Sequence, residues 1–233
     1  MRTPDSRFYC SEIMPGRFTL DENESSHAIK VCRGTVGDVL QLSDGKGHFA
    51  DGAIVEANAK ACIVQVESVQ TVSVERPKLS LAIACLKDDA LEEVVFHAAQ
   101  TEIDRIVFLR TEYSQEPKNS DLKKTVRRAE LKALVSLKQS KKPWLTQIEG
   151  PFEFKEWLAC YRGDLILCDI DGQGGMQIPT KPTTLLVGPE GGFSPNEIQM
   201  IKDYPKGDVR LLKLGNTRLR ARTAAIVALG KLL

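Results

Sequence analysis

A glycine-rich turn in the last quarter of the chain combines residue types suited to binding a small cofactor. Three glycines, a proline and a glutamate make up Gly188–Gly192, between a predicted buried strand at Thr184–Val187 and a helix predicted over Pro195–Tyr204. Ser194 and Glu197 match the cap and third positions of a helix start. Glycines let a backbone approach a ligand closely, and open α/β sheets bind ligands at the carboxyl ends of their strands. The turn is therefore a candidate cofactor site, the alternative being a turn whose glycines serve only backbone geometry.

The common nucleotide-binding motifs do not fit this turn. A P-loop needs a lysine followed by serine or threonine after its glycines, and this turn has neither. A dinucleotide fingerprint needs GxGxxG, and both Gly172–Gly175 and Gly188–Gly192 fail that spacing. The sequence thus argues against a nucleoside triphosphate or a nicotinamide cofactor.

A second segment, Leu211–Leu229, carries a cluster of cations. A strand-like run and a Gly215-Asn216 turn lead to Arg218, Arg220 and Arg222, which open an apolar helix predicted over 223–232. Taken alone, the segment predicts either an anion site at a helix start or a basic surface.

Together the two segments resemble a known family. LLVGPEGGFSPNEI (185–198) and LKLGNTRLRARTAAIVAL (212–229) are similar to the carboxyl-terminal signature of the RsmE family. These are SPOUT-class methyltransferases that modify N3 of a uridine in small-subunit (16S) ribosomal RNA. Weaker similarity at Ser26–Asp38, Lys87–Thr101 and Gln139-Ser140 extends the resemblance over nearly the whole chain.

The resemblance implies a fold, a cofactor and an assembly. It implies a small PUA-like β-barrel RNA-binding domain at residues 1–74, followed at 75–233 by a SPOUT α/β domain with a deep trefoil knot. S-adenosylmethionine is expected in the knot, and two subunits are expected to pair as a homodimer through the knot region. The implied cofactor-binding residues are Val187, Gly188, Pro189, Glu190, Gly191, Gly192, Leu212, Leu214, Gly215 and Leu219.

Two residues of these segments are candidates for the catalytic chemistry. Methyl transfer is an in-line displacement, and the N3 proton of uracil must leave before or during the attack. A nearby cation favours the anionic ring, which makes Arg220 the candidate for stabilising the base. Glu190, the nearest carboxylate in sequence, is the candidate to accept the proton, unless it only hydrogen-bonds neighbouring backbone amides.

The chain departs from the family pattern at several charged positions. The usual LRxET reads LRART, so that Arg222 replaces a glutamate, and Lys138 replaces the glutamate of a usual Glu-Gln-Ser. The usual Glu-Arg-Ser reads Glu112-Tyr113-Ser114, and the usual Glu-Leu-Gly reads Gln100-Thr101-Glu102. These departures leave two alternatives open: methylation of a different RNA uridine, or a cofactor-binding RNA module with little catalysis.

Charge is unevenly distributed along the chain. The 32 Lys and Arg nearly balance the 31 Asp and Glu, yet residues 1–75 carry a net −4 and residues 118–142 a net +7. Such a basic stretch in a neutral chain predicts a polyanion contact, with solvated helix faces as the alternative. The partner expected is ribosomal RNA or the small ribosomal subunit, and phosphate contacts are predicted for Arg7, Arg33, Lys123, Lys124, Arg127, Arg128, Lys141 and Lys142.

The hydrophobic pattern separates two regions near residues 72–77. Short alternating runs predict strands near 7–9, 39–42, 49–55 and 61–69, with one helix over 24–32 capped by Asp21 or Asn23. After Pro77, strands predicted at 79–85, 105–109, 165–168 and 184–187 alternate with helices. Those helices are predicted from Asp88 or Asp89 to Thr101, along Leu122–Leu137, and over 152–161, 195–204 and 223–232. This alternation indicates a parallel α/β sheet.

Composition excludes several other classes of protein. With 42% hydrophobic and 27% charged residues, the 233-residue chain has no run of roughly 18 apolar residues and no hydrophobic signal core at its start. Six cysteines without CxxC spacing and three histidines offer no zinc set, so no metal is expected. Reduced thiols in the cytoplasm, away from membranes, are the expectation.

Overall fold

The computed structural model describes residues 7–73, 76, 78–87, 89–114, 122–173 and 179–233. Its contacts divide the chain into two compact units: Met1–Val74 with Leu134–Leu145, and Glu75–Ala133 with Thr146–Leu233. Helix α3 (Leu122–Ser140) contributes its first part to the second unit and its last part to the first. The short segment Leu134–Leu145 thus packs with the amino-terminal unit although it follows the first strands of the other.

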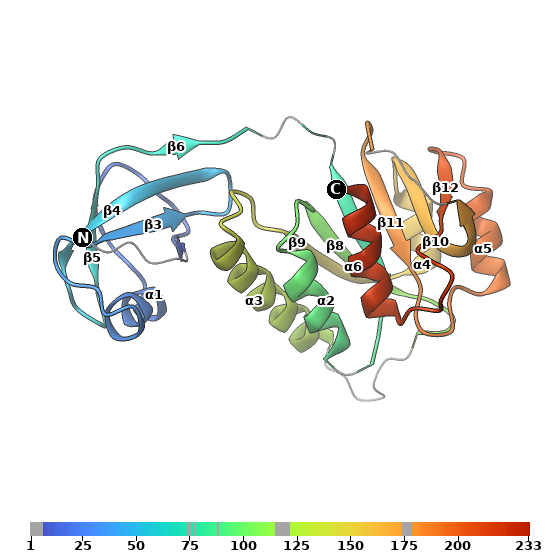
Figure 1. Ribbon diagram of the computed structural model, residues 1–233, viewed down its shortest axis with the longest axis horizontal. Coiled ribbons are helices and arrows are strands. Elements are labelled where there is room, and N and C mark those ends of the chain that lie inside the picture. The colour runs from blue at the N-terminus through green and yellow to red at the C-terminus, as the bar shows by residue number, and fades with distance from the viewer. Residues whose placement is uncertain (1–6, 74–75, 77, 88, 115–121, 174–178) are drawn as a thin grey trace. The chain divides into compact units, whose positions relative to one another are not determined.

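The first unit is built on a six-stranded mixed sheet (Figure 1). Its strands follow the order β1-β3-β4-β5-β2, with β6 paired to β4, and only β1 and β3 run parallel among these pairs. Inward residues such as Phe8, Leu40 and Val64 form its apolar core. The strands are β1 (Phe8–Tyr9), β2 (Gly16–Thr19), β3 (Val39–Ser43), β4 (His48–Glu56), β5 (Ile63–Val66) and β6 (Gln70–Thr71).

The helix expected over residues 24–32 begins earlier and changes type. Asp21 is its cap, and the Asp21 side chain accepts a hydrogen bond from the Glu24 amide at 2.8 Å. The first turns form α1 (Glu22–Ser26), and the chain continues as the π-helix η1 (His27–Val31). Gly34 closes the segment by donating its amide to the Ala28 carbonyl at 2.9 Å.

The second unit contains the parallel α/β sheet that the strand and helix alternation predicts. All five of its strand pairs are parallel, in the order β12-β10-β11-β7-β8-β9. The strands are β7 (Leu79–Ala84), β8 (Arg105–Arg110), β9 (Gln147–Glu153), β10 (Asp164–Gln173), β11 (Thr183–Val187) and β12 (Val209–Leu212). Their carboxyl ends therefore meet at one edge of the sheet.

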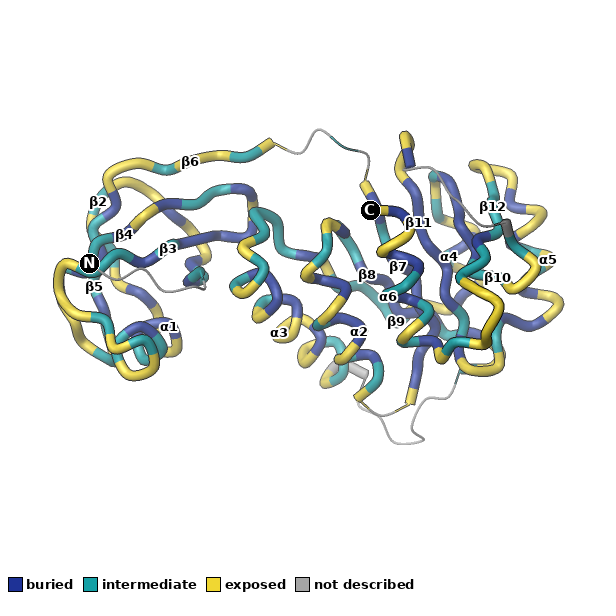
Figure 2. Tube along the Cα trace, viewed as in Figure 1, coloured by how far each residue is buried: buried dark blue, intermediate teal, exposed yellow. Residues whose placement is uncertain are grey.

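Helices cover both faces of this sheet (Figure 1). On one face α4 (Phe154–Cys160) and α5 (Pro195–Lys202) pack side chains such as Phe154 and Ile201 onto the central strands. On the other, α6 (Ala221–Leu232) packs against β11 and against α2 (Ala90–Ala98). Figure 2 shows the strands between these layers as mostly buried, and all five residues of β11 are buried. β11 begins with two buried threonines, Thr183 and Thr184, and ends with the apolar run Leu185–Val187, as suits a central strand that is covered on both faces.

Several elements differ from the sequence-based expectation. β2 and β9 were not expected, and the helix predicted over 152–161 begins only at Phe154 because the preceding residues belong to β9. β10 extends to Gln173, beyond the predicted end at Cys168. Asp88, one of the two caps expected for α2, lies outside the described residues, as do residues 118–121 of the basic stretch.

Within the described residues, no helix combines the length and apolar composition that a membrane crossing requires.

Candidate functional site

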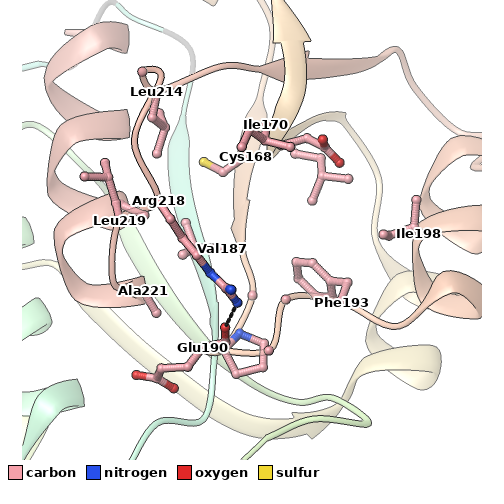
Figure 3. Close-up of a pocket in the computed structure, with 18 of the residues that line it drawn as sticks. Cys168, Ile170, Val187, Glu190, Phe193, Ile198, Leu214, Arg218, Leu219 and Ala221 are labelled. Carbon is pink, nitrogen blue, oxygen red and sulfur yellow. Dashed lines mark hydrogen bonds between the residues drawn. The ribbon is translucent and has the colours of Figure 1, made fainter.

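A pocket of about 480 Å³ opens at the carboxyl ends of the central strands (Figure 3). This volume lies within the range of small-molecule sites. Three segments form its walls: the end of β10, the β11–α5 turn, and the β12–α6 loop with the start of α6. The lining residues are Leu167, Cys168, Asp169, Ile170, Val187, Gly188, Pro189, Glu190, Gly191, Gly192, Phe193, Ile198, Leu214, Gly215, Thr217, Arg218, Leu219, Ala221 and Ala224.

The β11–α5 turn has the geometry that its glycines suggest. A Cβ on Gly188 would lie 3.0 Å from the Gly192 carbonyl carbon, so the turn folds back closely on itself. Gly192 has φ +76°, a left-handed conformation that favours glycine, and donates its amide to the Pro189 carbonyl at 2.8 Å. The glycines therefore leave room for a ligand along a bare backbone.

The helix that follows is anchored as the sequence predicts. Ser194 accepts a hydrogen bond from the Glu197 amide at 3.3 Å, and the Glu197 carboxylate accepts one from the Ser194 amide at 2.9 Å, which completes a capping box. The second Glu197 oxygen accepts the Glu112 amide at 2.9 Å. The buried Glu197 thus ties the turn after β8 to the start of α5, next to the pocket.

Arg218 joins two walls of the pocket. Its guanidinium donates a hydrogen bond to the Glu190 backbone carbonyl at 2.9 Å, as Figure 3 shows. The bond links the β12–α6 loop to the glycine turn, two segments that lie 28 residues apart in sequence. Sequence reasoning noted Arg218 only as part of a basic turn and did not assign it to the site.

The two catalytic candidates belong to the two segments that this bond joins. Glu190 lines the pocket and is exposed, and its carboxylate has no hydrogen-bond partner among the described residues. Arg220 is the exposed N-cap of α6 and is not itself a lining residue, but its neighbours Leu219 and Ala221 are. Among the described residues, the Arg220 guanidinium has no ion-pair or hydrogen-bond partner, so it remains available to a substrate.

The end of β10 is the part of the site that sequence reasoning missed. Cys168, Asp169 and Ile170 line the pocket because β10 continues past Cys168. Burial, followed by the charge of Asp169, raises the pKa of Cys168 to about 12, which keeps this thiol neutral. The available signal was the predicted strand itself, because its carboxyl end must lie beside that of β11 in a parallel sheet.

The predicted cofactor-binding residues converge on this pocket with one exception. Nine of the ten line it, whereas Leu212 is fully buried inside β12, where it pairs with Cys168 of β10. Leu212 therefore supports the wall from behind. No cluster of His, Cys, Asp and Glu suited to a metal ion occurs in the described part of the chain.

The two cations that stand at usual glutamate positions, Lys138 and Arg222, each form an ion pair with a carboxylate. Arg222 on α6 contacts Glu93 on α2 at 2.6 Å, with both side chains partly exposed. Lys138 near the end of α3 contacts the buried Glu24 at 2.5 Å, within the first unit. Each cation is thus accommodated by a carboxylate of this chain.

The eight predicted RNA-binding residues are divided between the two units. Arg33 is exposed and has φ +56°, and Arg7 is held by the Lys141 carbonyl at 2.7 Å and by the Phe49 ring. Burial lowers the pKa of Arg7 despite the opposing charge of Asp51. In the second unit, Arg128 is paired with Glu92 at 3.3 Å. Lys124, Arg127 and Lys141 are exposed, Lys142 is half-buried, and the side chain of Lys123 lies outside the description.

The chain matches two family models and resembles several known proteins. The RNA methyltransferase domain matches residues 74–233, and the RNA methyltransferase PUA domain matches residues 20–67. The Ribosomal RNA small subunit methyltransferase E of Mesomycoplasma hyopneumoniae is 28% identical over 229 residues, which cover 97% of each chain. A solved Legionella pneumophila structure with bound SAM has a TM-score of 0.84 and 27% identity, covering 97% of this chain and 96% of that one.

A more distant structure shares the same fold. The Ribosomal RNA small subunit methyltransferase E of Neisseria gonorrhoeae, bound to S-adenosyl methionine, has a TM-score of 0.85 at 19% identity over 97% of this chain and 95% of that one. The first family model covers well over half of the present chain, including every residue that lines the pocket. The chain therefore belongs to the RNA methyltransferase family that includes ribosomal RNA small subunit methyltransferase E.

Proposed function

We propose that this protein transfers a methyl group from S-adenosylmethionine to N3 of a uridine in small-subunit (16S) ribosomal RNA. The observation that carries the proposal is the pocket, in which a glycine turn and an arginine-bearing loop converge at the carboxyl ends of β10 and β11. The names of the relatives and the bound SAM in the Legionella structure support the same reaction.

The residues of the pocket fit S-adenosylmethionine. Apolar side chains such as Leu167, Val187 and Leu219 offer surfaces for an adenine ring, while the glycine turn exposes backbone amides and carbonyls. Asp169, Glu190 and Arg218 provide charges of both signs, as a ligand with an ammonium, a sulfonium and a carboxylate requires. When bound, the cofactor supplies an electrophilic methyl group on its sulfonium.

The chain's own residues supply acid–base and electrostatic assistance in this proposal. The unpaired Glu190 carboxylate accepts the N3 proton of the uracil, and the Arg220 guanidinium stabilises the negative charge that develops on the ring. Rigid placement of donor and acceptor contributes further, because the Arg218 contact and the Glu197 anchor hold the turn in place. Leu212, also among the expected cofactor residues, would act by supporting the pocket wall.

RNA binding is assigned to both regions of the chain. Residues 1–74 form the PUA-like β-barrel that helps to bind RNA, and residues 75–233 form the SPOUT methyltransferase domain. The matched PUA domain and the mixed sheet of the first unit support the former. Arg7, Arg33, Lys123, Lys124, Arg127, Arg128, Lys141 and Lys142 would contact phosphates, which position RNA without reading its sequence.

Three further features belong to the proposal. A deep trefoil knot is supported by the strand order β12-β10-β11-β7 and by the convergence of the turns after β11 and β12 on one pocket. Pairing of two subunits as a homodimer through the knot region follows from the family resemblance. A cytoplasmic location follows from the ribosomal substrate and fits the six free cysteines.

The inverted charges do not favour the alternatives of another RNA uridine or a module with little catalysis. Arg222 is paired with Glu93 and Lys138 with Glu24, and neither cation lines the pocket. The decisive experiment is nucleoside mass spectrometry of small-subunit RNA from cells with and without the gene. We expect N3-methyluridine to disappear on deletion and to return when purified protein and S-adenosylmethionine are added to the undermethylated subunits. An unchanged level would contradict the proposal, and mapping of all cellular RNA would then reveal another target.

A further inference from the structure

Tyr113 is an exposed aromatic residue held beside the cofactor pocket. Its side chain packs on Gly191, since a Cβ on that glycine would lie 3.3 Å from Tyr113 Cβ and 3.4 Å from Cδ2. Gly191 lines the pocket, so the tyrosine contacts a residue of the candidate cofactor site. Tyr113 is nevertheless 42% exposed, which leaves much of its surface accessible to a further ligand.

The turn that carries Tyr113 is fixed at several points. The Thr111 amide donates to Ser114 Oγ at 2.9 Å, the two hydroxyls of these residues lie 2.9 Å apart, and the Ser114 amide donates to the Thr111 carbonyl at 3.1 Å. Between them, the Glu112 amide donates to the buried Glu197 carboxylate at 2.9 Å. These bonds fix the backbone turn that carries Tyr113, and the contact with Gly191 supports its side chain. Such ordering before substrate binding lowers the entropic cost of a contact.

The other aromatic residue at the pocket is not available for such a contact. Phe193 lines the pocket but is only 8% exposed, and its ring packs against Phe154 with centroids 5.5 Å apart. Phe193 therefore belongs to the apolar core beneath α4 and α5. Among the aromatic residues described near the pocket, Tyr113 is the one with an accessible ring.

We infer that Tyr113 is a substrate-contact residue whose ring stacks on the target nucleobase while the cofactor occupies the adjacent pocket. The inference rests on the proposed function, since a base that is methylated must first leave its stack. An aromatic surface beside the methyl donor offsets part of the lost stacking energy, and aromatic stacking tolerates any base. In the resemblance described above, Tyr113 stands at the arginine of the usual Glu-Arg-Ser.

The test compares Tyr113→Ala and Tyr113→Phe with wild type and with Phe152→Ala. Phe152 on β9 is a matched control because it is also 42% exposed and does not line the pocket. We expect Tyr113→Ala to weaken binding of the undermethylated small subunit about 5- to 150-fold. Tyr113→Phe and Phe152→Ala should bind as wild type, and the affinity for S-adenosylmethionine, measured by calorimetry, should change less than about twofold in all variants.

A substrate with an abasic site at the target position separates stacking from a structural role. With this RNA, wild type and Tyr113→Ala should bind equally, because the ring has lost its partner. Equal binding of intact RNA by both proteins would overturn the inference, as would a parallel loss of cofactor affinity or a changed oligomeric state in Tyr113→Ala. If wild type forms no N3-methyluridine, the proposed function fails and the inference fails with it. If wild type forms N3-methyluridine and Tyr113→Ala binds the intact RNA as tightly as wild type does, the inference alone fails.

Discussion

The charged residues around the pocket differ in how far their bonding capacity is already used. Arg218 is bonded to the Glu190 carbonyl, and Arg222 is paired with Glu93 on the side of α2. Arg220, between them in sequence, has no such partner among the described residues. Since a guanidinium without a protein partner can give its donors to a substrate, the three arginines should respond differently to removal.

Arg220→Ala should slow methyl transfer about 10²- to 10³-fold, the usual cost of removing one group that stabilises developing charge. The affinity for S-adenosylmethionine should stay near that of wild type, because Arg220 does not line the pocket. Single-turnover methylation and calorimetry measure the two quantities. Arg222→Ala, two residues further along α6, is the control and should retain methylation within a few-fold. Equal losses in the two variants would contradict an electrostatic role for Arg220.

Arg218→Ala should weaken cofactor binding about 3- to 10-fold, as expected from the loss of one hydrogen bond that holds a binding loop. The exposed Arg162 provides a comparison, because it also donates to a backbone carbonyl, that of Tyr161 at 3.1 Å, and does not line the pocket. Arg162→Ala should leave the dissociation constant unchanged in the same titration. A dissociation constant for Arg218→Ala equal to that of wild type would show that the glycine turn holds its shape without this bond.

At the scale of elements, the pairing of α2 with α6 explains how an inverted charge is tolerated. The 2.6 Å contact between Arg222 and Glu93 joins the two helices on one face of the parallel sheet. A glutamate at position 222, as the family usually has, would instead place two carboxylates together. The acid on α2 and the base on α6 therefore form a matched pair in this chain.

A charge-reversal cycle tests that pairing. Arg222→Glu and Glu93→Arg should each destabilise the protein, and the double variant should recover most of the loss. Because both side chains are more than one-third exposed, the coupling free energy should be only about 0.2–1 kcal/mol. Urea denaturation of wild type, the two single variants and the double variant at low salt measures this coupling free energy. Higher salt should reduce the coupling. Additive effects of the two reversals would show that the contact contributes nothing in solution.

Some elements could be predicted from sequence because local signals agreed with the final fold, and others could not. The capping box at Ser194 and the cap at Asp21 are local hydrogen-bonding patterns, and both are confirmed. β9 contains Gly150-Pro151, a pair that ordinarily marks a break, and is tolerated because β9 is an edge strand whose register with β8 shifts at this point. The length of β10 depends on its pairing with β12, a contact between distant residues that no local pattern reveals.

Local motifs predicted part of the candidate site, and long-range pairing supplies the rest. The glycine turn and the loop after β12 carry motifs, and nine of the ten residues predicted from them to bind the cofactor line the pocket. Asp169 and Ile170 carry no motif and join the pocket only because β10 lies beside β11. The partners of Lys138 and Arg222 were equally hidden, since Glu24 and Glu93 lie 114 and 129 residues away in sequence. Long-range pairing, rather than composition, decides these contacts.

At the scale of the whole molecule, buried weak acids are present in both units. Burial is the largest cause that raises the pKa of Cys10 in the first unit and of Cys168 in the second, each from 9.0 to about 12. It also raises the pKa of Cys62, Tyr161 and Tyr204. Each of these groups stays neutral in the folded protein at a pH where the unfolded chain has begun to ionise.

Folding stability should therefore fall as the pH rises above about 9. Between this value and 12 the unfolded state binds fewer protons than the native state, so the free energy of unfolding decreases with pH, and below it the full stability is present. One thiol that ionises in the unfolded chain and not in the folded protein contributes a slope of up to about 1.4 kcal/mol per pH unit. Urea unfolding at several pH values between about 8 and about 10.5 measures the slope, and Cys168→Ala should make it shallower by up to that amount. Stability that is constant over this range, or an unchanged slope in Cys168→Ala, would mean that the thiol ionises as readily in the folded protein as in the unfolded chain.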